Sequence, residues 1–180
     1  MAPNRVMFIR HAEKPGFPPG SDGVTADGEQ DDESLTVRGW QRAGALAHFF
    51  NSQPKLRPQT VFASGTGHGS KSNRPVQTVT PAVDLFEQTA KLPFVTSHLK
   101  DDLQGVMSDV LSRTGIVLVC WQHELIPDLV KLLPNPPQVP QHWPGSRFDM
   151  VWVFDTAGAG WSFSQVPQML LAGDSADPIS

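Results

Sequence analysis

Cysteine is almost absent from this chain: Cys120 is the only one among 180 residues. A single thiol excludes any disulfide within the chain, and that fits a reducing compartment. Cys120 lies inside the apolar run 116–121, where a buried structural thiol is more common than a reactive one. We therefore expect a protein of the cytoplasm with no redox chemistry of its own.

Long apolar runs are also missing. No segment approaches the length that a membrane span requires, and the N-terminal apolar run 6–9 is interrupted by Arg10, which excludes a signal peptide. The formal net charge of −4 argues against a general nucleic-acid binder, which usually carries a basic face. We predict neither a membrane nor a nucleic-acid partner, while a small basic pocket for an anion stays possible.

Metal-binding patterns are lacking as well. The chain has no H-E-x-x-H motif, and His48, His68, His98 and His142 show no spacing typical of metal ligands. Segment 65–72 comes close to a phosphate-binding P-loop, but Ser70 stands where that pattern requires glycine before the lysine. We therefore expect no metal and no cofactor.

Five short apolar segments predict strands. Segments 6–9, 60–63 and 116–121 are apolar on both faces, which is typical of interior strands in a mostly parallel sheet. Segment 150–154 follows, and the weak alternation in 161–166 suits an edge strand. The chain length fits one domain, which we place at residues 1–173, with a short C-terminal tail at 174–180.

Helical periodicity separates these strands. Apolar residues recur at three- and four-residue steps in 37–50 after a possible N-cap at Thr36, and again in 76–86, 103–111 and 126–133. Alternating strands and helices predict an α/β fold, a three-layer sandwich with a mostly parallel central sheet and helices on both faces. The glycine- and proline-rich segments 14–34 and 134–144 are predicted to be long surface loops.

Basic residues follow the predicted interior strands. Arg10 and His11 end the first strand, His123 follows the third, and Arg74 opens the helix after the second. Ligands of open α/β sheets bind beyond the carboxyl ends of the parallel strands, so these side chains are expected to share one crevice. A guanidinium group can donate two parallel hydrogen bonds to phosphoryl oxygens, and an imidazole can attack phosphorus. The pattern predicts a phosphoryl-transfer site.

Four motifs in order resemble the histidine phosphatase superfamily, also called the phosphoglycerate-mutase-like superfamily. Arg10-His11-Ala12-Glu13 resembles its Arg-His-Gly/Ala motif, and Leu35-Thr36 with Gly39 and 41–43 resembles its Leu-Thr-x-x-Gly helix start. Ser64 with 74–78 resembles its Ser…Arg-x-x-Gln-Thr element, and 117–121 leading to His123 is similar to the strand that carries its second histidine. The segment between Ser64 and Arg74 is longer than the family pattern leads us to expect.

The resemblance implies a metal-independent phosphatase. His11 would be the nucleophile that becomes phosphohistidine, and Arg10, Arg74 and His123 would hold the phosphoryl oxygens. The substrate would be a phosphomonoester or a phosphoramidate, on a small molecule or a phosphoprotein. Two other functions stay open: a phosphomutase of the same superfamily, and a non-catalytic module that only binds phosphate.

The proton donor for the leaving group is not fixed by the motifs. One branch of the superfamily places an acid directly after the second histidine, and Glu124 fits that position. Another branch takes the acid from the segment after the second arginine, where Asp101 lies, and Glu13 is a third option. We favour Glu124, because it follows His123 at the same strand exit.

Overall fold

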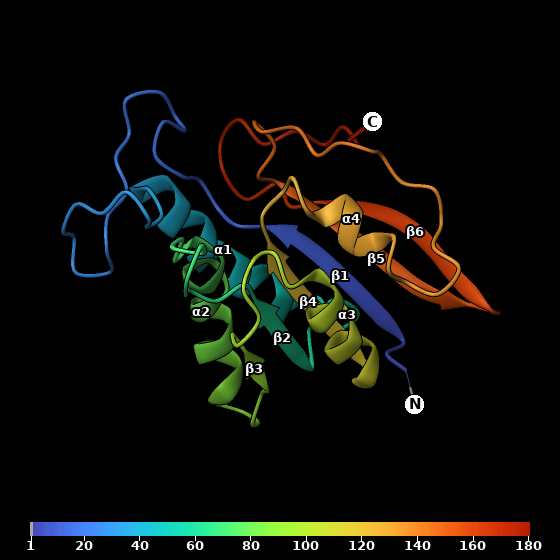
Figure 1. The fold of residues 1–180 in the computed structure, drawn as a ribbon. Helices are drawn as coiled ribbons and strands as arrows, with labels where there is room; N and C mark the ends of the chain where they lie inside the picture. Colours follow the sequence, from blue (N-terminus) through green and yellow to red (C-terminus); the bar gives the residue numbers. More distant parts are fainter. Residues whose placement is uncertain (1) are drawn as a thin grey trace.

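The computed structural model describes residues 2–180 and has one six-stranded sheet in the order β3-β2-β4-β1-β5-β6 (Figure 1). The strands are β1 (Arg5–Arg10), β2 (Thr60–Ala63), β3 (Phe94–Val95), β4 (Ile116–Trp121), β5 (Met150–Ala157) and β6 (Gly160–Pro167). The helices are α1 (Val37–Ser52), α2 (Arg74–Glu87), α3 (Leu103–Ser112) and α4 (Ile126–Val130).

The parallel part of the sheet comprises β3, β2, β4 and β1. Strand β5 pairs antiparallel with β1 on one side and with β6 on the other. In the register, Arg10 at the end of β1 lies opposite Trp121 at the end of β4, and Ala63 at the end of β2 lies opposite Cys120. The carboxyl ends of these three strands therefore lie at one edge, as expected for a crossover sheet. The prediction that the last strand is an edge strand is confirmed by β6.

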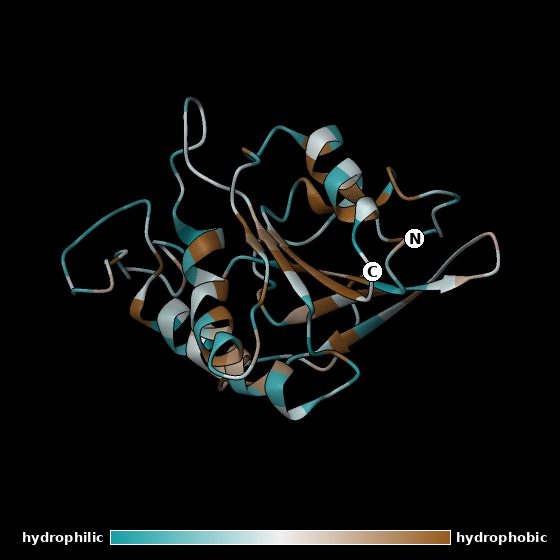
Figure 2. Ribbon diagram, turned by 90° about the horizontal axis from the view of Figure 1, so that it is seen from below, coloured by the Kyte–Doolittle hydropathy of each residue, from teal (hydrophilic) through white to brown (hydrophobic). Residues whose placement is uncertain are grey.

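Two hydrophobic clusters cover the two faces of the sheet. Alternate residues of β1 divide between them: Val6 and Phe8 pack with α3 and α4, whereas Met7 and Ile9 pack with α1 and α2. Figure 2 shows the apolar residues concentrated in the strands between the helices. Because each interior strand is apolar on both faces, it needs a helical layer on each side. The predicted three-layer α/β sandwich is confirmed.

The start of α1 is built onto the chain that follows β1. Thr36 caps the helix by accepting from the amide of Gly39, and its own amide donates to the carbonyl of Glu13. A Cβ on Gly39 would lie 2.5 Å from the Glu13 carbonyl oxygen, so only glycine lets the backbones approach this closely. The Leu-Thr-x-x-Gly motif thus fixes the strand exit at residues 11–13.

Several local predictions differ from the structure. The helix predicted over 126–133 is the single-turn α4, Ile126–Val130, after which the chain continues in turns toward Pro134. The two-residue strand β3 was not predicted, because its length is below any periodicity signal. Loop 134–144 does not lie wholly at the surface, since Trp143 is fully buried and its Nε1 donates to the carbonyl of Arg147 at 2.9 Å.

The C-terminal residues after Gly173 form neither helix nor strand, but they pack onto the domain. Ile179 joins the hydrophobic cluster beside α3 and α4, and its amide donates to the side chain of Gln165 on β6. The division into a domain and a tail remains a prediction. Within residues 2–180, no helix combines the length and apolar character that crossing a membrane would require.

Candidate active site

The residues after β1, β2 and β4 gather at the carboxyl edge of the sheet. The amide of His11 donates to the carbonyl of Trp121 at 3.1 Å, and the amide of Ser64 donates to the carbonyl of Cys120 at 3.4 Å. Gln122, directly after β4, exchanges hydrogen bonds with the Ser64 hydroxyl. These bonds continue the parallel register by one residue, so the three strand exits are held in fixed relation.

His11 is buried, with 4% of its surface exposed, and its Nδ1 lies 2.8 Å from the carbonyl oxygen of Ala12. A carbonyl oxygen only accepts, so Nδ1 carries the proton and Nε2 keeps its lone pair. Burial, and then the positive charge of Arg10, lower the pKa of His11 to about 3. The ring is therefore a neutral imidazole with a free nitrogen at neutral pH, the form that a nucleophile requires.

The guanidinium of Arg10 is held from one side by loop 144–148. Its Nη1 donates to the carbonyls of Gly145 at 2.6 Å and Arg147 at 3.1 Å. The guanidinium carbon, Cζ, lies 3.7 Å from the ring centre of Phe148. Its Nε and Nη2 are buried without a hydrogen-bond partner among the described residues. Two unsatisfied donor nitrogens on a buried cation are ready to bind an anion.

Arg74 reaches the same edge from the first residue of α2. Its Nη1 donates to the carbonyl of Asp32 at 2.7 Å, and its Nη2 lies 3.7 Å from a carboxylate oxygen of Glu33. Its Nε is buried and has no partner in the described part of the chain. The Thr78 hydroxyl, one turn along α2, donates to the carbonyl of Arg74 and accepts from the amide of Ala12. The Arg-x-x-Gln-Thr element therefore fixes α2 against the nucleophile loop.

His123 and Glu124 form a contact pair after β4. Nδ1 of His123 lies 2.8 Å from Oε2 of Glu124, whose side chain is 58% exposed. The contact with His123 lowers the pKa of Glu124 to about 2, against the opposing effect of burial. Glu124 is therefore a carboxylate in the free protein at neutral pH.

A pocket of about 390 Å³ brings the predicted site residues together. His11, Arg74, His123 and Glu124 line it, and Arg10 lies close enough to lower the pKa of His11. Sequence reasoning missed six further polar residues of the lining: Lys14, Glu33, Lys71, Ser72, Lys100 and Gln122. Gln122 follows a strand end and was open to prediction, whereas the others lie on loops whose paths no local pattern specifies.

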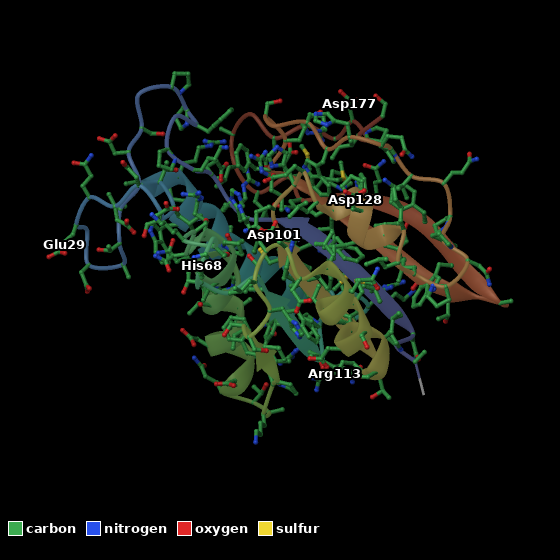
Figure 3. All side chains as sticks on the ribbon, viewed as in Figure 1. Glu29, His68, Asp101, Arg113, Asp128 and Asp177 are labelled. Atoms are coloured by element: carbon green, nitrogen blue, oxygen red, sulfur yellow. The ribbon has the colours of Figure 1, made fainter. Side chains whose placement is uncertain are left out.

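Two alternative proton donors are separate from this pocket. Glu13 is buried in ion pairs with Arg42 and Arg38. Asp101 is exposed on the connection between β3 and α3, where Figure 3 labels it, and is not part of the lining. Trp121 and Trp143 lie outside the lining as well, since both are fully buried in the core beside α3 and α4.

Comparisons with known proteins agree with this geometry at the level of the fold. No family model matches the chain, and no curated protein matches by sequence. A solved structure assigned as the phosphohistidine phosphatase SixA from Agrobacterium tumefaciens has a TM-score of 0.51 and 18% identity, covering 91% of this chain and 97% of that one.

Two more solved structures share the fold. One is assigned as an alpha-ribazole-5′-P phosphatase from Escherichia coli, with a TM-score of 0.57, 12% identity, and coverage of 91% of this chain and 96% of that one. The other is a mutant phosphoserine phosphatase from Entamoeba histolytica in complex with phosphoserine, with a TM-score of 0.52, 12% identity, and coverage of 93% and 98%. The resemblance to the histidine phosphatase superfamily is confirmed in its fold.

Proposed function

We propose that this chain, which has the fold of the histidine phosphatase superfamily, is a member of it and a phosphatase. It would hydrolyse a phosphomonoester or a phosphoramidate, on a small molecule or a phosphoprotein, through phosphohistidine on His11. The observation that supports this most is the state of His11, a neutral ring whose proton is held on Nδ1 by Ala12. It lies in one pocket with Arg74 and His123.

In the proposed first step, Nε2 of His11 attacks phosphorus, and the bond from phosphorus to the leaving oxygen or nitrogen breaks. The free N–H groups of Arg10 and Arg74, together with His123, would bind the equatorial phosphoryl oxygens as charge spreads over them. In the second step, water attacks phosphorus and gives a proton to the group that protonated the leaving atom, the nitrogen–phosphorus bond breaks, and phosphate leaves with His11 restored. The arginines supply the positive charge, so we propose that the reaction needs no metal.

Glu124 is our proposed proton donor, because of the three acids considered it alone lines the pocket. Its low pKa in the free protein comes first from His123, and a bound phosphoryl dianion would compete for that ring and raise the pKa. Only a small fraction of Glu124 is protonated at neutral pH. Leaving groups that need little acid assistance, such as phosphoramidate nitrogens, would therefore be favoured.

The test is a rapid acid-free quench of the protein during turnover of p-nitrophenyl phosphate. We expect a phosphorylated protein whose adduct is labile in acid and stable in base, as phosphohistidine is, located on His11 by peptide mapping. His11→Ala should remove both the adduct and turnover while the circular dichroism spectrum stays unchanged. Appreciable turnover by His11→Ala would contradict the assignment.

Two other functions are less well supported. A mutase must retain and reorient its intermediate beneath a cover, and the pocket lies open beside exposed residues such as Gly69 and Lys71. A module that only binds phosphate needs no neutral histidine with a free nitrogen beside its arginines. Hydrolysis of p-nitrophenyl phosphate without transfer to a second hydroxyl would separate the proposed phosphatase from both.

A further inference from the structure

Three lysines around the candidate active site form no salt bridge within the described residues. Lys14, Lys71 and Lys100 all line the pocket, and each comes from a different loop: after β1, before α2 and before α3. Across residues 2–180, none of their ammonium groups takes part in a hydrogen bond or a salt bridge. Of the two carboxylates of the lining, Glu33 lies 3.7 Å from Arg74 and Glu124 lies 2.8 Å from His123, while the charge of Glu124 also acts on Lys14.

The positive charge of the three lysines comes in addition to the charge that binding one phosphoryl group requires. Arg10 and Arg74, whose charges act on His11, already have buried N–H groups without a partner that can satisfy the phosphoryl oxygens. The cations of the lining outnumber its two carboxylates, and their mutual repulsion is a cost that a bound anion reduces. The pKa of Lys14 is lowered by burial and then by Arg10 and Arg74, against a smaller raising effect of Glu124, which places its ammonium within the field of the phosphoryl site. The hydroxyl oxygen of Ser72, another lining residue, is also buried and has no hydrogen-bond partner among residues 2–180.

From this arrangement we propose that the pocket binds a small substrate with a second anionic group, held by Lys14, Lys71 and Lys100 beside the transferred phosphoryl group. The inference rests on the proposed function and names its substrate class. A volume of about 390 Å³ suits a small ligand rather than phosphate alone. Lysine ammonium groups bind carboxylate and phosphate alike, since each is a point charge with several donors, so either can supply the second anion.

The test compares three synthetic substrates with similar leaving groups. The reference is 3-hydroxypropyl phosphate; propane-1,3-diol bisphosphate places a second phosphate on its free hydroxyl, and 3-carboxypropyl phosphate places a carboxylate there. We expect at least one of the two compounds with a second anionic group to exceed the reference in kcat/KM by about tenfold or more, since charge-assisted hydrogen bonds are strong. The two arms distinguish phosphate from carboxylate as the second anion.

The preference is the ratio of kcat/KM for a compound with the second anion to kcat/KM for the reference. In the triple variant Lys14→Gln, Lys71→Gln, Lys100→Gln this ratio should fall to about three or less. The matched control replaces three exposed lysines away from the pocket, Lys55, Lys91 and Lys131, by glutamine, so the net charge changes equally. The control should keep the wild-type preference. A wild-type kcat/KM ratio near one for both the bisphosphate and the carboxylate compound would overturn the inference. A preference that the pocket triple variant retains would overturn it as well.

Binding to His11→Ala protein separates this inference from the proposed function. Titration calorimetry of His11→Ala protein should show tighter binding of the compounds with a second anion, whether or not the wild type turns them over. The preference should disappear when the three pocket lysines are also replaced by glutamine. Turnover of p-nitrophenyl phosphate with equal affinity for all three compounds would refute the second-anion site alone. Absence of turnover and of a His11 adduct, with the binding preference present, would refute the phosphatase and leave the anion site supported.

Discussion

Arg42 donates through Nε and Nη2 to the carboxylate of Glu13, at 2.9–3.1 Å, and both side chains are almost fully buried. The remaining donors of the guanidinium bind Asp174 and Gln168. One arginine on α1 therefore joins the loop that follows the candidate nucleophile to the C-terminal segment. Burial by itself would lower the pKa of Arg42, but the hydrogen bonds with Asp174 and Glu13 raise it above its ordinary value.

Replacing Arg42 should destabilise the fold strongly. Arg42→Met leaves the buried carboxylate of Asp174 without its cation and leaves Glu13 with Arg38 alone, which we expect to lower the free energy of unfolding by about 3–5 kcal/mol. Urea denaturation at neutral pH measures it. The control Lys131→Gln removes an exposed pair with Asp128, labelled in Figure 3, and should cost less than about 1 kcal/mol. Equal losses in the two variants would refute this role for Arg42.

Phe148 should act as a positioning residue for Arg10. Its ring stacks on the guanidinium and leaves Nε and Nη2 free, so Phe148→Leu should weaken competitive inhibition by inorganic phosphate and reduce kcat/KM, each about 5- to 30-fold. Phe148→Tyr keeps the aromatic face and should restore both constants. Loss of thermal stability in Phe148→Leu with an unchanged inhibition constant would indicate a role in packing alone.

The proton donor can be identified from leaving-group dependence. If Glu124 protonates the leaving oxygen, Glu124→Gln should slow hydrolysis of alkyl phosphates by about 10²–10⁴-fold and that of p-nitrophenyl phosphate far less. Glu33→Gln is the matched control, since it removes a carboxylate of the same pocket that contacts Arg74 instead of His123. A uniform decrease in Glu124→Gln would make Glu124 an orienting partner of His123. A steep dependence in Asp101→Asn would move the role to Asp101.

The pKa of His11 predicts a contribution to stability that depends on pH. Its pKa is about 3 in the folded protein and 6.5 ordinarily, so between these values the unfolded chain binds a proton that the folded one does not. This contribution is complete above pH 6.5 and decreases as the pH falls toward about 3. Between about pH 7.5 and pH 5, the wild type should lose about 2 kcal/mol more stability than His11→Ala. Parallel pH profiles in urea denaturation would contradict a neutral buried His11.

Activity should be independent of divalent metal. The arginines supply the countercharge for the phosphoryl group, and the described residues hold no cluster of three or more side chains suited to a metal ion. Turnover of p-nitrophenyl phosphate should survive dialysis against EDTA, with phosphate and vanadate inhibiting competitively. Loss of activity in EDTA, restored by one divalent ion, would overturn the metal-independent mechanism.

The sequence alone determined the layers of the fold and the order of the motifs. Residues 6–9 and 116–121 are apolar on both faces, and only the interior of a sheet covered on both sides buries such strands. Because interior parallel strands end at one edge, the positions of Arg10, His11 and His123 in the chain were sufficient to predict a shared site. These are local patterns combined with a rule of topology.

Only the tertiary structure decided which charges are satisfied. Glu13 and Glu124 are equally acidic in sequence, yet one is paired with Arg42 in the interior and the other faces the pocket. The lysines at 14, 71 and 100 converge because three irregular loops fold over one strand edge, and no periodicity specifies the path of a loop. Trp143 is buried for the same reason, although it lies in a proline-rich segment. Hydrogen bonds and ion pairs between residues distant in the chain depend on that packing, which local sequence does not encode.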